Sequence, residues 1–290
     1  MLTERARAKV NLTLHVRGRR ADGYHDLESL VAFADSADGL TLTPAPTLAL
    51  RVSGPRAAEC GDLDDNLVLK AARTLGERVP GLTAGTFDLD KHLPAAAGIG
   101  GGSADAAAAL RLLARANGIS VDDPRVADAG RATGADVPVC LRSSACMMRG
   151  VGEKLSAVTM PPLPAVLINP GVPVATRDVF AALGLQAGDT FAIDAQSAPI
   201  AWPTTVSPAD WLRAIASGRN DLERPALRIQ SVINDVLAML RNSDGCELAR
   251  MSGSGATCYG IFRTGAAAAD AARRVNAAQP HWWVIATTLS

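Results

Sequence analysis

The chain has 290 residues, of which 48% are hydrophobic and 20% charged, and its 29 Lys and Arg residues balance 29 Asp and Glu residues. Balanced charge gives no global field that attracts a polyanion, which disfavours nucleic acid as a main partner. The five cysteines form no CxxC pair, which favours free thiols in a reducing compartment over disulfides or a zinc site. No stretch approaches the roughly 18 apolar residues of a membrane span, and the N-terminus lacks the apolar stretch of a secretory signal. We therefore expect a cytoplasmic protein, in a bacterial cytosol, without a membrane partner.

The length suits two domains, and the first third of the chain carries mainly strand signals. Residues 9–16 alternate strictly between polar and apolar, which predicts a half-buried strand whose polar face carries Lys9 and Asn11. Asp22-Gly23 predicts a hairpin turn, after which Tyr24-His25 opens the returning strand. Further strands are expected at 40–52 and 86–90.

Helix signals dominate the middle of the chain. A helix start is expected at 62–66, a second helix is expected from the glycines before Ser103 to about residue 116, and a third over 124–132. The segment Pro161-Pro162-Leu163-Pro164 predicts a boundary between a domain of residues 1–160 and one of residues 161–290.

The C-terminal part alternates between the two kinds of element, which predicts an α+β fold. Strands are expected at 165–169, 258–262 and 282–288, and helices near 176–183, 221–240 and 266–278. The segment 184–208 is rich in Ala, Pro, Gln and Ser and carries little information.

The glycine-rich loop is the strongest local signal. Four glycines at positions 98 and 100–102 allow a ligand to approach the backbone where any Cβ would clash. Ser103 is expected to cap the helix that follows, so that its amide groups and dipole face an anion, most simply a phosphate. The loop lacks the Lys-Ser/Thr of a Walker loop, and Ser103 stands where a dinucleotide fingerprint needs glycine. A merely flexible turn is the alternative, but ordering four clustered glycines is entropically unfavourable without a ligand.

Two polar residues indicate phosphoryl transfer when they are taken together. Lys9 alone is an ordinary solvated residue, and Asp136 in Gly134-Ala-Asp-Val-Pro138 alone is a turn cap. An Asp that accepts a hydroxyl proton and a Lys that stabilises the transferred group are what transfer to an alcohol requires. The turn Ser252-Gly-Ser-Gly-Ala-Thr257 is either a tight turn into a strand or a second wall of the phosphate pocket.

Tyr24 is one of only two tyrosines and lies beside a turn, which suggests a platform on which a base stacks. The remaining histidines are not spaced as a metal cluster and are interpreted as structural or surface residues; they are His15, His92 and His281.

The order of these motifs resembles the galactokinase/homoserine/mevalonate/phosphomevalonate (GHMP) kinases. The resemblance rests on the motifs around Lys9, at 20–25, at 94–105, at 134–138 and at 252–257, and it covers residues from about 8 to 262. Residues 22–25 together with 134–138 resemble those members that phosphorylate the 2-hydroxyl of a cytidine-diphosphate-linked methylerythritol in the non-mevalonate isoprenoid pathway. This small molecule is therefore the implied substrate.

The resemblance implies a two-domain architecture, with an N-terminal domain like ribosomal protein S5 domain 2 that holds ATP and a ferredoxin-like C-terminal domain on the acceptor side. ATP and Mg²⁺ are the implied cofactors, with Ser103 and the ATP phosphates as the metal's ligands. Lys9 and Asp136 match the catalytic pair. The implied ATP-binding residues are Asn66, Lys91, Pro94, Ala95, Ala96, Ala97, Gly98, Ile99, Gly100, Gly101, Gly102, Ser103 and Ala104. The implied substrate-binding residues are Asn11, Tyr24, His25, Thr176 and Phe180.

The sequence departs from the resemblance at two places. Three alanines fill positions 95–97, where relatives often carry glycine, and Ala104 stands where a second Ser is common. Two other functions stay open: a GHMP kinase that acts on another small alcohol, and a non-catalytic nucleotide sensor on the same scaffold. A homodimer is an open expectation for the assembly.

Overall fold

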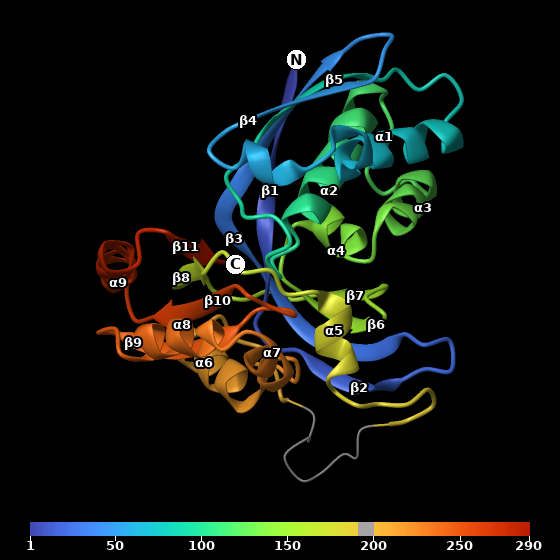
Figure 1. Ribbon diagram of the computed structural model, residues 1–290. Coiled ribbons are helices and arrows are strands. Elements are labelled where there is room, and N and C mark those ends of the chain that lie inside the picture. Colours follow the sequence, from blue (N-terminus) through green and yellow to red (C-terminus); the bar gives the residue numbers. More distant parts are fainter. Residues whose placement is uncertain (191–199) are drawn as a thin grey trace. The chain divides into compact units, whose positions relative to one another are not determined.

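A computed structural model describes residues 1–190 and 200–290 and consists of two compact units that interleave along the chain (Figure 1). Unit 1 contains Met1–Lys9, Ser36–Ala95 and Gly100–Ser143, and unit 2 contains Val10–Asp35, Ala96–Ile99 and Ser144–Ser290. The sequence predicts two continuous domains that meet after residue 160. Each compact unit instead contains three separate segments of the chain, so the predicted domain boundary stays a prediction. Of the segment 184–208, residues 191–199 lie outside the described residues.

Unit 1 contains four strands, of which β1 and β3 continue into unit 2. The strands are β1 (Leu2–Asn11), β3 (His25–Pro44), β4 (Ala49–Ser53) and β5 (Gly85–Asp90). β5 lies antiparallel to β3, with Leu89 opposite Leu40, and parallel to β4, with Leu89 opposite Val52. The strands predicted at 40–52 and 86–90 are confirmed. The first range is divided between β3, which ends at Pro44, and β4, which begins at Ala49.

Helices of unit 1 gather beside these strands (Figure 1). They are the short helices η1 (Ala57–Cys60) and η2 (Leu63–Asp65), followed by α1 (Leu67–Arg78), α2 (Gly101–Ala116), α3 (Pro124–Thr133) and α4 (Val137–Arg142). α2 packs against α1, α3 and α4, and its buried stripe contains Leu110, Leu112 and Leu113. The helices predicted after residues 62–66 and over 124–132 are confirmed; their caps are the side chains of Asn66 and Asp123.

Unit 2 is built on antiparallel strands. They comprise part of β3 with β2 (His15–Arg19), β6 (Cys146–Gly150), β7 (Lys154–Ala157), β8 (Leu163–Asn169), β9 (Cys246–Met251), β10 (Cys258–Phe262) and β11 (Trp283–Leu289). β2 and β3 pair as the predicted hairpin, with Arg19 opposite His25. Gly23 in the turn has φ +88°, a conformation that favours glycine.

Unit 2 contains five helices among the described residues, and two of them, α8 and α9, pack on its sheet. They are α5 (Thr176–Ala181), α6 (Pro208–Ser217), α7 (Glu223–Ile229), α8 (Val232–Arg241) and α9 (Gly265–Ala278). α8 packs on β9 and β10, and α9 packs on β8 and β11. The single helix predicted over 221–240 is two helices, because Gln230 adopts an extended conformation after Ile229.

The prediction that residues 9–16 form one half-buried strand is wrong in both respects. β1 ends at Asn11 and β2 begins at His15, so the alternating segment is interrupted. Its polar side chains are buried as well as its apolar ones, including Lys9 and Asn11. A buried ammonium and a buried amide need partners, and these partners define the candidate site.

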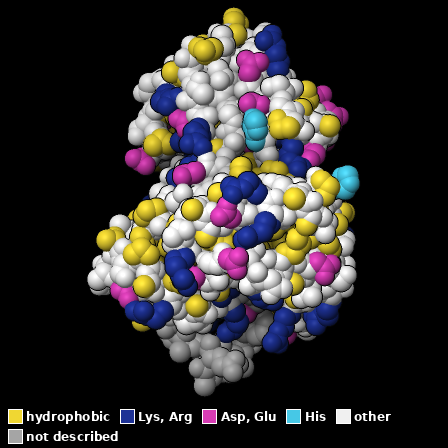
Figure 2. All heavy atoms as spheres, turned by 90° about the vertical axis from the view of Figure 1, so that its left-hand side faces the viewer, with side chains coloured by type: hydrophobic (Ala, Val, Ile, Leu, Met, Phe, Trp, Pro, Cys, Tyr) yellow, Lys and Arg dark blue, Asp and Glu magenta, His cyan; other side chains and the backbone are white. Residues whose placement is uncertain are grey.

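Lys and Arg side chains are interspersed with Asp and Glu on the face of the molecule that Figure 2 shows. No helix among residues 1–190 and 200–290 is long and apolar enough to cross a membrane.

Candidate active site

Lys9 and Asp136 meet in unit 1. Lys9 lies near the end of β1, and Asp136 immediately precedes α4. The Lys9 Nζ atom donates a hydrogen bond to Asp136 Oδ2 over 3.0 Å, and the side chains are 6% and 39% exposed respectively. The carboxylate of Asp136 does not cap α4. The turn-cap interpretation of Asp136 is therefore wrong, because its side chain compensates a buried ammonium instead.

The glycine loop leads into the first turn of α2 beside this pair. Gly100 is the N-cap of α2 with φ +62°, and no side chain caps the helix. The expectation that Ser103 caps α2 is wrong, because the helix begins two residues earlier, at Gly101. A Cβ on Gly100 would lie 3.5 Å from Cβ and Cε of Lys9, which is ordinary packing contact, so the positive φ is what favours glycine here. The first-turn amides of α2 therefore remain available for an anion.

Lys91, expected near the adenine, has partners within unit 1 for its ammonium and for its backbone groups. Its Nζ atom donates to Asp38 Oδ2 over 2.5 Å and to Asp105 Oδ2 over 2.6 Å, and all three side chains are buried. Its backbone N–H donates to Ser53, and its carbonyl accepts from Arg56. Burial raises the pKa of the Asp105 carboxyl; Lys91 opposes this shift and Asp38 adds to it.

Asn66 is the other residue expected near the adenine. Its side-chain oxygen accepts the N–H of Val68 and so caps α1. A Cβ on Gly102 would lie 3.5 Å from Leu67 Cδ1, which places the start of α1 next to the start of α2. The positions of Asn66 and Lys91 relative to adenine stay predictions.

Within unit 2, the two glycine turns lie against each other. A Cβ on Gly98 would lie 2.6 Å from the carbonyl oxygen of Gly255. A Cβ on Gly253 would lie 2.8 Å from the carbonyl oxygen of Gly98. The N–H of Thr257 donates to Ala97, and the Ser252 hydroxyl donates to Gly98. The turn at 252–257 is therefore more than a strand-entry turn, because it supports residues 97–98 of the glycine loop.

Asn11 belongs to the same arrangement in unit 2. Its N–H donates to Ser252 Oγ, and its Nδ2 donates to Ser29 Oγ. Among the described residues, its buried Oδ1 has no hydrogen-bond partner. A buried amide oxygen without a partner is unfavourable, so the atom fits a ligand that donates a hydrogen bond.

Three of the remaining acceptor-side residues of unit 2 meet at α5, namely His25, Thr176 and Phe180. The Thr176 hydroxyl lies 2.8 Å from that of Ser254, and Phe180 follows one turn later. The Phe180 ring stacks on the His25 imidazole with centroids 4.6 Å apart and planes inclined by 29°. His25 Nε2 is buried without a partner among the described residues, and burial, with Arg19, lowers the His25 pKa. Tyr24, next to it, is 65% exposed.

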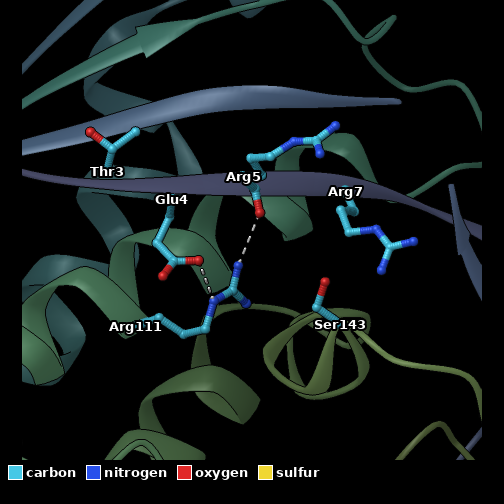
Figure 3. A pocket seen from close by; sticks show the side chains of 6 residues that line it. All are labelled: Thr3, Glu4, Arg5, Arg7, Arg111 and Ser143. Carbon is cyan, nitrogen blue, oxygen red and sulfur yellow. Dashed lines mark hydrogen bonds and ion pairs between the residues drawn. The ribbon is translucent and has the colours of Figure 1, made fainter. Parts of the chain in front are cut away.

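A separate pocket of about 350 Å³ lies in unit 1 (Figure 3). It is lined by Thr3, Glu4, Arg5, Arg7, Arg111 and Ser143. Arg111 donates to the Glu4 carboxylate, to the Arg5 carbonyl and to carbonyls at the end of α4. No residue predicted for the active site lines this pocket.

Within residues 1–190 and 200–290, no group of three or more His, Cys, Asp or Glu residues forms a metal cluster. The five cysteines are free thiols. One of them, Cys140, lies on α4 near the Lys9–Asp136 pair; burial raises its pKa, and Asp136 adds to the shift.

The structure thus gathers the predicted residues in two sets. Unit 1 holds Lys9, Asp136 and the start of α2, and unit 2 holds Asn11, His25, Thr176, Phe180 and the two glycine turns. Sequence reasoning missed Asp38 and Asp105 as the partners of Lys91. The one available signal was the position of Asp105 at the end of the glycine motif.

Comparison with known proteins shows which family the chain belongs to. The model of the GHMP kinase N-terminal domain matches residues 66–144, and that of the GHMP kinase C-terminal domain matches residues 207–281. The curated 4-diphosphocytidyl-2-C-methyl-D-erythritol kinase of Nitrobacter hamburgensis is 63% identical over 100% of this chain and 96% of its own length. The protein of the same name from Rhodopseudomonas palustris is 62% identical, over 100% and 97%.

Solved structures show the same fold. A crystal structure of 4-(cytidine 5'-diphospho)-2C-methyl-D-erythritol kinase has a TM-score of 0.78 and 33% identity, over 100% of this chain and 99% of the other. The homoserine kinase of Cytophaga hutchinsonii has a TM-score of 0.68 at 17% identity, over 99% and 94% of the two chains, which shows the fold alone. The mixed helices and sheet, with N- and C-terminal domains, are those of this fold, and the chain belongs to the GHMP kinase family.

Proposed function

We propose that the protein transfers the γ-phosphoryl group of ATP to the 2-hydroxyl of 4-diphosphocytidyl-2-C-methyl-D-erythritol, giving the 2-phosphate and ADP. The observation that carries the chemistry is the contact between the buried Lys9 ammonium and the half-exposed Asp136 carboxylate. The acceptor follows from full-length relatives that bear the name of this kinase. ATP is the phosphoryl donor of GHMP kinases.

Asp136 acts on the acceptor hydroxyl. Its carboxylate orients this hydroxyl and takes its proton as the oxygen forms a bond to the γ-phosphorus. The bond between that phosphorus and the β,γ-bridging oxygen breaks, and its electron pair leaves with ADP. Oδ2 of Asp136 is held by Lys9, which fixes the carboxylate and leaves its other oxygen for the hydroxyl.

Lys9 stabilises the negative charge that spreads over the transferred group. Its stem is buried against Gly100, so the ammonium is fixed beside the N-terminus of α2. A positive group fixed in advance stabilises a transition state more than a mobile one, because it needs no reorganisation.

The glycine loop, residues 94–104, binds the triphosphate. The uncapped first turn of α2 supplies amide donors and the positive end of its dipole. The Ser103 hydroxyl, in this turn, is the side chain that would contribute to Mg²⁺, which neutralises phosphate charge when bound. Asn66 and Lys91 are assigned to the adenine side of the nucleotide.

The cytidine of the acceptor is assigned to the hairpin residues and to α5. Tyr24 offers an exposed ring for stacking. Phe180 stacks on His25 with one face of its ring, so its other face is the one assigned to the base. His25 Nε2 and Asn11 Oδ1 are buried atoms that need a partner. The cytosine edge would bond to His25, and the polyol to Asn11.

A test with three acceptors separates the proposal from its alternatives. ADP release should be robust with 4-diphosphocytidyl-2-C-methyl-D-erythritol and near background with homoserine or mevalonate, and CMP should compete with the acceptor. Preference for another alcohol, without CMP inhibition, would keep the kinase reaction and replace the acceptor. ATP binding without turnover on any of the three would support a nucleotide sensor. We also expect that the protein is cytoplasmic, that it forms a homodimer and that it does not bind nucleic acid.

A further inference from the structure

The buried triad of Lys91, Asp38 and Asp105 lies in unit 1 at the two ends of the glycine loop. Lys91 directly follows β5 and precedes the loop, whereas Asp105 belongs to α2, which the loop leads into. The Lys91 ammonium contacts both carboxylates. The two residues are 14 positions apart in the sequence, and everything between them is the loop with its stems.

Asp38, on β3, fixes the stem before the loop through three hydrogen bonds. Its Oδ1 accepts the backbone N–H groups of His92 and Leu93 over 2.6 and 2.8 Å, and its Oδ2 accepts Lys91 Nζ. The stem after the loop is fixed by Asp105 through the same ammonium. One cation therefore joins both stems to the sheet.

We propose that Lys91, Asp38 and Asp105 form a clasp that closes the stems of the glycine loop, so that the Lys91 ammonium positions the loop for the triphosphate of ATP. The proposal rests on the proposed binding of ATP by this loop. It accounts for the engagement of all three polar groups of Lys91, since its ammonium, N–H and carbonyl already have partners.

The glycine content of the loop explains why a clasp is needed. A segment with four glycines has many conformations to lose when it binds a ligand. Holding its two ends in the free protein removes part of that loss before ATP binds. Opening the clasp should therefore weaken ATP binding, and it should leave acceptor binding almost unchanged.

The charges of the triad decide which substitutions are informative. Two carboxylates share one ammonium in a buried site, and burial raises the Asp105 pKa. Asn at position 105 keeps the size and a hydrogen-bond acceptor for Lys91, and it leaves a neutral Lys91–Asp38 pair. Ala at position 105 removes the link from α2 to Lys91 altogether.

The experiment compares Asp105→Ala, Asp105→Asn and the control Glu4→Ala by steady-state kinetics and hydrogen exchange. Glu4 also receives two cationic side chains, Arg111 and Arg115, in unit 1, but it lies outside the loop. Asp105→Ala should raise KM for ATP at least about tenfold and KM for the acceptor less than about threefold. Exchange should accelerate in peptides covering 92–106 and stay unchanged elsewhere. Asp105→Asn and Glu4→Ala should both stay within about threefold of the parent KM for ATP.

Any of three results would overturn the proposal. They are an unchanged KM for ATP in folded Asp105→Ala, equal rises in the KM values for ATP and for the acceptor, and faster hydrogen exchange throughout the protein. If Asp105→Ala does not fold, the double variant Lys91→Gln/Asp105→Asn replaces the ammonium and the Asp105 carboxyl by amides of similar size, and the same readouts decide. Titration with ATP and the exchange measurement need no acceptor. A failure of the clasp is therefore distinguishable from a wrong acceptor.

Discussion

Lys9 Nζ and Asp136 Oδ2 lie 3.0 Å apart although 127 positions separate the two residues in the chain. Their exposure differs, because the Lys9 side chain is buried and that of Asp136 is open on one side. A buried cation fixes the carboxylate, and the exposed side of the carboxylate leaves space for a hydroxyl group. This asymmetry suits a base that must meet a substrate.

Replacing Asp136 by Asn should lower kcat by at least about a hundredfold, because the amide does not accept the hydroxyl proton. The amide oxygen still accepts from Lys9, so the melting temperature and the Kd for ATP should stay near the parent values. Steady-state kinetics, thermal unfolding and ATP titration measure these three quantities. Near-normal kcat in a folded variant would remove Asp136 from the role of base.

The contact between the two glycine turns predicts that Gly98 and Gly171, two glycines of unit 2 with nearly the same φ, respond differently to replacement by Ala. Gly98 has φ +75° and Gly171 has φ +74°, so Ala at either position is strained by about 1 kcal/mol. Only at Gly98 would the new Cβ meet backbone atoms, at 2.6 to 2.9 Å. Gly98→Ala should therefore destabilise by about 1–3 kcal/mol more than Gly171→Ala, and it alone should weaken ATP binding.

Chemical denaturation and ATP titration of the two variants test this prediction. Equal stability losses would show that the backbone at 98 moves away from Gly255 without a penalty. Unchanged ATP affinity in folded Gly98→Ala would remove this turn from the triphosphate site.

Tyr24→Ala should raise KM for the acceptor by about tenfold or more, since stacking on a base contributes about 1–3 kcal/mol. The side chain is 65% exposed, so its loss should not change the melting temperature. KM for ATP should change less than about twofold. The matched control is Val121→Ala, at another exposed apolar residue, and it should alter neither KM. Equal rises in both KM values for Tyr24→Ala would argue against base stacking.

His15 predicts a loss of stability in mild acid. Its imidazole is buried, and its two nitrogens have no hydrogen-bond partners among the described residues. Burial lowers its pKa below 6.5, and Asp221 opposes the shift. The unfolded chain therefore binds the proton more readily, so stability is complete above pH 6.5 and falls as the pH drops below that value.

Denaturant unfolding between pH 7.5 and pH 5 tests this on His15→Gln, with His281→Gln at an exposed position as the control. The slope of unfolding free energy against pH should be smaller in His15→Gln than in the parent, and unchanged in the control. The same slope in all three proteins would exclude His15 as a source of acid sensitivity.

Elements with strong local signals were predictable from the sequence, and long-range pairings were not. Asp123-Pro124 and Gly134 bracket α3, and Asp22-Gly23 fixes the hairpin, because caps and turns depend on neighbouring residues. α4 was missed because it has only six residues and contains Pro138. The break at Gln230 carries no Gly or Pro signal, so α7 and α8 were predicted as one helix.

The sequence motifs named candidate site residues, but the contacts of these residues could not be derived from the sequence. Alternation identified the polar side of residues 9–16, but burial of that side depends on packing from both faces. The motifs indicated Lys91 without revealing its partners, since Asp38 lies 53 positions away and has no motif of its own. The contact between the two glycine turns is also set by tertiary structure alone.

The most direct test of the central claim is the proton-coupled phosphorus NMR spectrum of the product formed from ATP and 4-diphosphocytidyl-2-C-methyl-D-erythritol. The 2-hydroxyl is on a carbon without hydrogen, so its phosphate monoester should give an uncoupled resonance that grows in step with ADP and is nearly absent with Asp136→Asn. A doublet or triplet would place the phosphate on a secondary or primary hydroxyl. ADP formation without a new monoester, or an unaffected Asp136→Asn reaction, would contradict the account.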